Sequence, residues 1–269
     1  MKIDLRDEAL SKYDGYLKDK LPELCRDQSN PSFGQYNLLA HLSTYFDNDI
    51  VVDIGTGATA ASARALSYNE TNTVYSYDTE FSEIAKGHID RLDNVIYEVF
   101  NPLKSSKDRD IMMSASLISL DVDPHDGKKE AEFYGFFLNN DWKGIMICDD
   151  IRMGWDSRHD HITMASFWNN VHKPKYDLTT TKYSHHTGTG LICFDNQEVF
   201  FNLDSSKTTD DPHLWVTSLD NETTIERFDD GTFITNYGAT GTWDVVVDAA
   251  GEEKILIKTQ SGSIEVPNF

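Results

Sequence analysis

The segment at residues 50–57, which reads Ile-Val-Val-Asp-Ile-Gly-Thr-Gly, restricts the possible folds of this chain more than any other stretch. A short and nearly continuous apolar run is typical of a strand that is buried on both faces of a parallel sheet. Gly55 and Gly57 then let the backbone turn tightly and come close to a ligand. The same glycines also serve in tight turns that bind nothing, so a purely structural turn is the alternative.

After this strand, segments with a strand pattern alternate along the chain with segments with a helical pattern. Strands separated by helices imply right-handed crossovers and a sheet with helices on both faces. The last two expected strands are joined by about ten residues without a helical pattern, which favours antiparallel pairing. We therefore expect an α/β fold with a doubly wound, mostly parallel, seven-stranded sheet whose last strand is reversed. The expected strands are 50–55, 73–77, 95–100, 116–120, 144–148, 176–180 and 191–194, and the expected helices are 37–46, 59–68, 80–91, 127–139 and 160–171.

The C-terminal region differs from the rest in charge and in pattern. Residues 196–269 contain 14 acidic and 4 basic side chains, and the polar stretch at 202–212 reads as a linker or a long turn. Short β-branched and aromatic runs follow it, separated by turn signals such as Asp230-Gly231. We expect three parts: a helical segment at 1–47 that caps the substrate, an α/β domain at 48–196, and a small antiparallel β module at 197–269.

Composition excludes several classes of protein. Of the 269 residues, 39% are hydrophobic, so the chain can build a core and is not disordered as a whole. Its 24 basic and 45 acidic side chains give a net charge of −21, which argues against nucleic-acid and membrane partners. No apolar run is long enough to span a membrane, and the N-terminus is charged and has no apolar segment, so we expect neither a membrane span nor a secretory signal. Three widely spaced cysteines indicate neither a disulfide framework nor a zinc site, so we expect a cytoplasmic protein.

A carboxylate stands where the next expected strand ends. Asp78 follows Val-Tyr-Ser-Tyr and lies 25 residues after Asp53. This spacing is close to the roughly 20 residues that precede a ribose-binding carboxylate in dinucleotide folds. Ala60 occupies the position of the third glycine in that motif. The two segments together predict a cofactor that contains a ribose, and an NAD(P)-dependent oxidoreductase is one candidate.

With these motifs the chain resembles the class I S-adenosylmethionine-dependent methyltransferases. Residues 51–59, Val-Val-Asp-Ile-Gly-Thr-Gly-Ala-Thr, look like the first motif of that family, and 75–78, Tyr-Ser-Tyr-Asp, look like the second. The reversed hairpin expected at 176–194 is typical of the same fold and unusual among dehydrogenases. The resemblance covers residues 48–195 and implies a Rossmann-like methyltransferase domain that binds S-adenosylmethionine. The residues that it implies around this cofactor are Asp53, Gly55 and Gly57 at the methionine portion, Asp78 at the ribose, Phe100 and Asn101 near the adenine, and Asp121.

Acidic side chains follow two neighbouring expected strands. Asp121 and Asp123 come after the strand at 116–120, and Asp149 and Asp150 come after the strand at 144–148. Parallel strands end at the same edge of a sheet, so these carboxylates should converge beside the glycine turn. Crowded carboxylates repel one another unless a cation is present, and oxygen ligands favour Mg²⁺, Mn²⁺ or Ca²⁺. Solvated turn aspartates are the alternative in so acidic a protein.

The stretch at 120–127 carries a second resemblance, because it reads Leu-Asp-Val-Asp-Pro-His-Asp-Gly. It is similar to the Asp-Gly-Asp-His stretch of a metal-assisted O-methyltransferase subgroup, related to catechol O-methyltransferase and to cephalosporin-hydroxylase-like enzymes. The resemblance implies a divalent metal, Mg²⁺ in the first place, held by residues among Asp121, Asp123, Asp149 and Asp150. The inserted proline leaves open whether Asp121 or Asp123 is the ligand.

Histidines near this edge of the sheet are candidate proton acceptors. His125 stands among the carboxylates, and His185 and His186 lie in the loop that returns to the same edge. We expect His125 and His186 to be catalytic. His159 and His161 follow Asp150 in a segment that could cover the site.

These observations favour an S-adenosylmethionine-dependent methyltransferase, metal-assisted, that methylates a hydroxyl of a small molecule or a saccharide. An NAD(P)-dependent oxidoreductase is the first alternative. The second is a non-catalytic protein that binds a glycan or a protein through residues 197–269. The sequence leaves the acceptor and the oligomeric state open, with a homo-oligomer among the possibilities.

Overall fold

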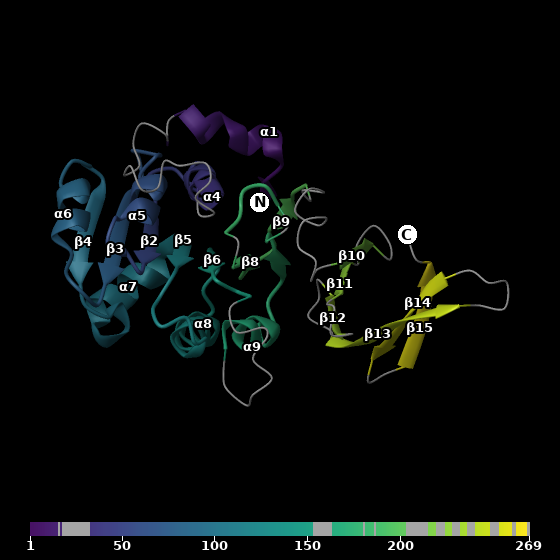
Figure 1. Cartoon of the computed structure of the whole chain (residues 1–269). Coiled ribbons are helices and arrows are strands. Elements are labelled where there is room, and N and C mark those ends of the chain that lie inside the picture. Colours follow the sequence, from purple (N-terminus) through teal and green to yellow (C-terminus); the bar gives the residue numbers. More distant parts are fainter. Residues whose placement is uncertain are drawn as a thin grey trace. The chain divides into compact units, whose positions relative to one another are not determined.

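The computed structural model divides into two compact units, Met1–Leu203 and Asp204–Phe269 (Figure 1). The structure describes residues 1–15, 17, 33–152, 163–179, 181–185 and 187–202, together with the backbone of six strands between residues 215 and 267.

A seven-stranded sheet forms the centre of the first unit, with the strand order β4-β3-β2-β5-β6-β8-β7. Neighbouring strands are parallel except that β8 runs antiparallel to both β6 and β7. The predicted doubly wound sheet with a reversed last strand is therefore confirmed. The chain moves outward from β2 in one direction and resumes at β5 on the other side, which creates a switch point where open sheets bind ligands. The strands are β2 (Ile50–Ile54), β3 (Thr73–Asp78), β4 (Val95–Val99), β5 (Ala115–Leu120), β6 (Ile145–Asp149), β7 (Lys175–Asp177) and β8 (Thr189–Cys193).

The register of the sheet brings the ends of four strands to one level. Ile54 at the end of β2 pairs with Tyr77 of β3 on one side and with Leu120 of β5 on the other. Leu120 in turn pairs with Cys148 of β6. The residue that follows each of these four paired residues therefore lies at the same edge of the sheet. These residues are Gly55, Asp78, Asp121 and Asp149.

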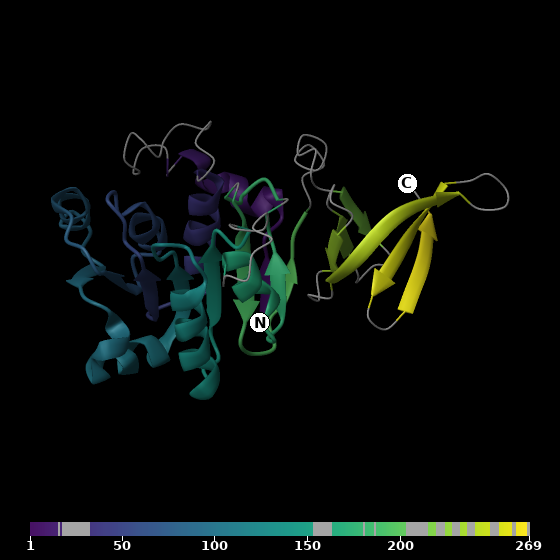
Figure 2. The same cartoon turned by 60° about the horizontal axis from the view of Figure 1, so that its bottom comes forward.

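Helices cover both faces of the sheet, as Figure 1 and Figure 2 show. Val51 packs in a core with side chains of α4 and α5, whereas its neighbour Val52 packs in a second core with α7, α8 and α9. This alternation follows from the two-residue period of a strand. In the part of the chain that the structure describes, no helix is both long and apolar enough to cross a bilayer. The helices are α4 (Phe33–Ser43), α5 (Ala61–Leu66), α6 (Glu83–Ile89), α7 (Ser106–Ser114), α8 (Lys128–Asn139) and α9 (Met164–Asn169), with short 3-10 turns at η1 (Ser11–Tyr13) and η2 (Pro102–Lys104).

The sequence predicted a helical segment at residues 1–47, but the N-terminal segment is not helical throughout. It begins with strand β1 (Lys2–Asp4), which pairs in parallel with β9 (Glu198–Phe200). Only then do α1 (Asp7–Leu10) and η1 follow, and they bury Leu10 and Tyr13. The pairing joins segments that are far apart in the sequence, so no local pattern reveals it. It also keeps β9 in the first unit, which therefore extends beyond residue 196.

The second unit is a six-stranded antiparallel meander in which each strand pairs with the next one along the chain. The predicted antiparallel β module is thus confirmed. Its longest ladder pairs β13 with β14, where Trp243 stands opposite Ile257. The strands are β10 (Trp215–Ser218), β11 (Thr224–Arg227), β12 (Thr232–Thr235), β13 (Thr240–Val247), β14 (Glu253–Thr259) and β15 (Gly262–Pro267).

Candidate active site

The glycine turn after β2 packs directly against the end of β5. Gly55 has a φ of +95°, and a Cβ atom at this position would overlap the carbonyl oxygen of Asp121. The Gly55 amide donates to the carbonyl of Tyr77 at 2.8 Å, and the Asp121 amide donates to the carbonyl of Ile54 at 2.9 Å. Gly57 also has a positive φ, +64°, but the space around its missing side chain is open. The turn therefore needs glycine at 55 for packing, and at 57 it leaves room for a ligand.

Asp78 is fixed next to this turn by backbone hydrogen bonds. Its Oδ2 accepts from the amide of Gly57 at 2.9 Å, and its Oδ1 accepts from the amide of Glu80 at 3.1 Å. The side chain is only partly buried. Each carboxylate oxygen can accept more than one hydrogen bond, so Asp78 can still bind ligand hydroxyls at the sheet edge.

Asp53 is completely buried at the end of β2. Its Oδ2 accepts from the Ser76 hydroxyl at 2.7 Å, and its Oδ1 has no hydrogen-bond partner. Burial raises the pKa of Asp53 from 3.8 to about 7, against the opposing hydrogen bond from Ser76. A buried acceptor without a partner is the kind of group that a cationic ligand atom satisfies.

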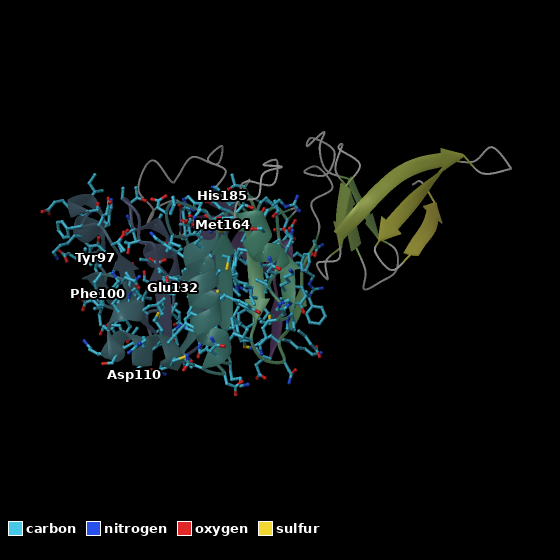
Figure 3. All side chains as sticks on the ribbon, turned by 90° about the horizontal axis from the view of Figure 1, so that it is seen from below. Tyr97, Phe100, Asp110, Glu132, Met164 and His185 are labelled. Carbon is cyan, nitrogen blue, oxygen red and sulfur yellow. The ribbon has the colours of Figure 1, made fainter. Side chains whose placement is uncertain are left out.

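Phe100 and Asn101 follow β4, at a distance from the carboxylates. Figure 3 shows Tyr97 and Phe100 well apart from His185. The Phe100 ring meets the Tyr77 ring edge-on, with centroids 5.7 Å apart. The Asn101 side chain accepts from the Leu103 amide at 2.9 Å and so caps η2. An adenine contact by these residues stays a prediction.

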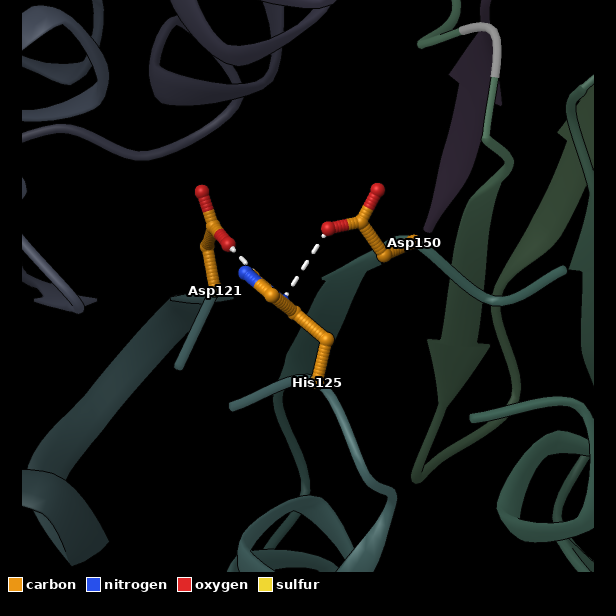
Figure 4. A group of neighbouring side chains, drawn as sticks. All are labelled: Asp121, His125 and Asp150. Carbon is orange, nitrogen blue, oxygen red and sulfur yellow. Dashed lines mark ion pairs between the residues drawn. The ribbon is translucent and has the colours of Figure 1, made fainter. Parts of the chain in front are cut away.

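His125 lies between two carboxylates that come from different strand ends, as Figure 4 shows. Its Nδ1 is 3.0 Å from Oδ2 of Asp150 and 3.7 Å from Oδ1 of Asp121. Its Nε2 faces the other way and is 3.1 Å from Oδ1 of Asp123, whose side chain is 94% exposed. Of the two acids that the sequence left open, Asp121 is the one that faces the cluster.

A second histidine approaches the same group from the loop between β7 and β8. The Nδ1 of His185 is 3.3 Å from Oδ1 of Asp150 and 3.6 Å from Oδ1 of Asp149. The hydroxyl of Thr187 hydrogen-bonds both Asp150 and His185. Asp149 also accepts from the backbone amide of Asp150 at 2.9 Å.

The pKa values of these groups record the crowding of negative charge. Burial, reinforced by Asp150, raises the pKa of Asp121 to about 6. Burial and the nearby Asp121 raise the pKa of Asp149 to about 8. Burial opposes the ionisation of Asp150, but hydrogen bonds from His185 and Thr187 hold its pKa below the ordinary value. Burial likewise opposes the charged form of His185, yet its acidic neighbours raise its pKa.

At this edge, two residues have a backbone conformation that residues other than glycine rarely adopt. His125 has a φ of 55° and Asp150 a φ of 57°, both in the left-handed region. Such conformations cost of the order of 1 kcal/mol or more and persist where surrounding contacts enforce them, often at functional sites.

The donor set of this cluster fits a divalent cation. Two groups of three side chains have ligand atoms within 4.8 Å of one another: Asp121, His125 and Asp150, and Asp149, Asp150 and His185. Around one ion with metal–ligand distances of about 2.1–2.3 Å, adjacent ligand atoms lie about 3 Å apart. These side chains could hold a cation, and the glycine turn, Asp78 and Asp53 could hold a cofactor with a ribose and a cationic end.

The sequence anticipated most of this constellation. Gly55, Asp78, Asp121, Asp149 and Asp150 meet at one edge. His186, His159 and His161 lie outside the described residues. The sequence placed His185 among the candidate proton acceptors but favoured His186, and it missed Thr187, because nothing in a loop pattern tells which side chain turns inward.

No family model matches the chain, and no curated protein matches it by sequence. Three solved structures similar to it are a provisionally assigned O-methyltransferase from Klebsiella pneumoniae, a provisionally assigned caffeoyl-CoA O-methyltransferase from Staphylococcus aureus, and the O-methyltransferase TomG from Streptomyces achromogenes in complex with SAM. Their identities are 13%, 14% and 18%, and their TM-scores are 0.46, 0.44 and 0.44. The alignments cover 70%, 68% and 71% of this chain and 90%, 91% and 91% of the three others. All three scores are below 0.5, and it is the strand order of the chain itself that defines its fold.

Proposed function

We propose that the protein is an S-adenosylmethionine-dependent methyltransferase that methylates a hydroxyl group with the help of a divalent cation. The observation that carries this proposal is the contact between Gly55 and Asp121. It joins the turn that suits the cofactor to the carboxylate that suits the cation, so a methyl donor and an acceptor oxygen would meet there. The reversed strand β8 favours this activity over nicotinamide chemistry, since it is typical of methyltransferase folds.

The residues at the ends of β2 and β3 would hold the cofactor. Asp78 would accept hydrogen bonds from the ribose hydroxyls, because its oxygens retain acceptor capacity beside the turn. The open space at Gly57 would let the cofactor come close to the backbone of the turn. Asp53 would balance the ammonium group of the methionine portion, which removes the cost of its unpartnered oxygen.

The residues at the ends of β5 and β6 would hold the cation and the acceptor. We assign Asp121, Asp150 and Nδ1 of His125 to a divalent ion, since the separations of 3.0 and 3.7 Å suit ligands of one centre. His125 is then a ligand in preference to the proton acceptor expected from the sequence. Such an ion supplies Lewis acidity that lowers the pKa of the acceptor hydroxyl and fixes its position. The acceptor would be a small molecule or a saccharide.

Calorimetric titration with S-adenosylhomocysteine, and separately with NAD, tests the cofactor. We expect binding of S-adenosylhomocysteine alone, and weaker binding after Asp78→Ala. Binding of NAD instead, or of neither compound, would overturn the proposal. The cation is tested apart from the cofactor, by titrating chelator-treated protein with Mg²⁺ and Mn²⁺ and counting bound ions.

A further inference from the structure

The two carboxylate oxygens of Asp150 face different histidines. Oδ2 lies 3.0 Å from Nδ1 of His125, and Oδ1 lies 3.3 Å from Nδ1 of His185. The two histidines come from separate segments, one after β5 and the other between β7 and β8. Asp150 therefore stands between two imidazole nitrogens and presents one oxygen to each.

Each side of Asp150 has a further carboxylate of its own. Asp121 lies 3.7 Å from Nδ1 of His125, and Asp149 lies 3.6 Å from Nδ1 of His185. Both sides thus offer two carboxylate oxygens and one imidazole nitrogen within 4.8 Å. The cluster is a pair of similar half-sites that share one residue.

We propose that Asp150 bridges two divalent ions, and that Asp149, Asp150 and His185 form a second metal site. The inference rests on the proposed function, which assigns only the first ion, held by Asp121, His125 and Asp150. A carboxylate that gives one oxygen to each of two ions suits the separation of about 3.5–4 Å found in two-metal sites. The Thr187 hydroxyl hydrogen-bonds both Oδ1 of Asp150 and Nδ1 of His185, so it would have to turn away from the nitrogen when an ion binds there.

Charge balance also favours two ions. Three carboxylates converge here, and Asp149 and Asp150 are both buried. One divalent ion leaves a net negative charge among three ionised carboxylates, and buried charge without compensation is costly. Two ions outweigh the carboxylates and leave room for an anionic acceptor oxygen. Because each half-site includes an imidazole nitrogen, both sites should take Mn²⁺ or Co²⁺ in preference to Mg²⁺ or Ca²⁺.

Metal stoichiometry of the full-length, chelator-treated protein tests this inference without an assay of activity. Mn²⁺ is titrated by calorimetry, and bound metal is counted by elemental analysis after gel filtration. We expect two Mn²⁺ per chain in the wild type and one after His185→Ala or His185→Gln. Electron paramagnetic resonance should show a coupled pair in the wild type and an isolated ion in the His185 variants. His172→Ala, which changes an exposed histidine elsewhere, should retain two ions.

The outcomes separate this inference from the proposed function. A single Mn²⁺ in the wild type, or an unchanged count after both His185 substitutions, would overturn the second site and leave the first one standing. No bound metal would overturn both sites, whereas binding of S-adenosylhomocysteine decides the methyltransferase assignment independently. Thermal melting shows whether each variant is folded, and the Gln variant keeps a polar side chain of similar size if the Ala variant is unstable.

Discussion

Gly55 lies so close to Asp121 that a methyl group on the glycine would occupy the position of the aspartate's carbonyl oxygen. The backbone ladder between β2 and β5 creates this contact, since the amide of Asp121 continues it by bonding Ile54 at 2.9 Å. The main chain of Asp121 is thereby fixed against the glycine turn, while its side chain points to His125. One residue thus belongs to both halves of the proposed site.

Gly55→Ala should therefore damage both halves at once. The added methyl group must push Asp121 away, and the φ of +95° is unfavourable for alanine. We expect the affinities for S-adenosylhomocysteine and for Mn²⁺ each to fall by about tenfold or more, as when a group that orients a metal ligand is lost. Gly57→Ala is the matched control, because its φ of +64° is also unfavourable for alanine but its methyl group enters open space, so it should weaken only the cofactor. Calorimetry of both variants with both ligands decides, and unchanged Mn²⁺ binding in Gly55→Ala would contradict the coupling.

Asp78→Ala should weaken cofactor binding specifically. A hydrogen bond to a charged group contributes about 1.5–3 kcal/mol, so we expect a loss of roughly 10- to 100-fold in affinity for S-adenosylhomocysteine. Mn²⁺ binding should stay the same. Asp93→Ala removes an equal charge from an exposed position before β4, at the opposite edge of the sheet, and serves as the control. Equal affinities of the two variants would show that Asp78 does not contact the cofactor.

Asp53→Asn should stabilise the ligand-free protein at high pH. The folded protein keeps the Asp53 proton up to about pH 7, whereas the unfolded chain releases it near the ordinary pKa of 3.8. The unfolded state therefore gains stability relative to the folded one as the pH rises between these values, and the cost is complete above pH 7. Each pKa unit corresponds to about 1.4 kcal/mol, so the cost reaches a few kcal/mol.

Melting curves at pH 5 and pH 8 measure this effect. The melting temperature of Asp53→Asn, relative to the wild type, should rise by about 5 °C between the two values. Asp93→Asn, at an exposed position, is the control and should keep the same difference from the wild type at both pH values. If the wild type and Asp53→Asn keep the same difference at both pH values, the carboxyl does not titrate as described. The same substitution should reduce S-adenosylhomocysteine binding, because the compensating charge for the ammonium is lost.

Asp121 and Asp123 should behave differently although they are two residues apart. Asp121→Asn removes a carboxylate that faces the cluster, whereas Asp123→Asn changes a side chain that is 94% exposed. We expect Mn²⁺ affinity to fall by about 100-fold in the first variant and by about tenfold or less in the second, because Asp123 contacts only the outer nitrogen of His125 and does so from an exposed position. Calorimetry in one buffer gives both values. A larger loss in Asp123→Asn would assign the ligand to the other aspartate.

The sheet and the meeting of its acidic ends followed from local pattern. Short apolar strands such as 50–54 end in Asp or Gly, and parallel strands bring such ends to one edge. Other features could not be predicted from the sequence, also for physical reasons. The pairing of β1 with β9 depends on contacts between distant segments, and α7 has too few apolar residues to stand out as a helix. That Asp121 and not Asp123 faces the cluster depends on which residue continues the ladder with Ile54.

The histidines illustrate a second limit. Residues in a loop have no period, so the sequence placed His185 near the edge without choosing it as a ligand. Its contacts with Asp149 and Asp150 come from the antiparallel pairing of β6 with β8, where Asp149 stands opposite Thr189 and the loop before β8 comes back to the same edge. Long-range register, not local composition, decides such a position.

The ion pair between Arg152 and Asp177 should stabilise the fold around this loop. The guanidinium of Arg152 donates to Oδ2 of Asp177 from Nη2 at 3.1 Å and from Nε at 3.3 Å, and the side chains are 15% and 17% exposed. The Arg152 amide also donates to the carbonyl of Thr187 at 2.9 Å, so the pair links the segment after β6 to β7 and to the His185 loop. Breaking a largely buried pair leaves an uncompensated charge, and we expect Arg152→Ala to cost about 2–4 kcal/mol.

A double-mutant cycle with Asp177→Ala, followed by urea denaturation, measures this pair directly. The double variant should be less destabilised than the sum of the single variants, with a coupling of about 1–3 kcal/mol. Lys143→Ala breaks the exposed pair with Asp141 and should leave the denaturation midpoint unchanged, because solvent screens that pair. Strict additivity of Arg152→Ala and Asp177→Ala would mean that the two side chains stabilise the protein independently, through other contacts.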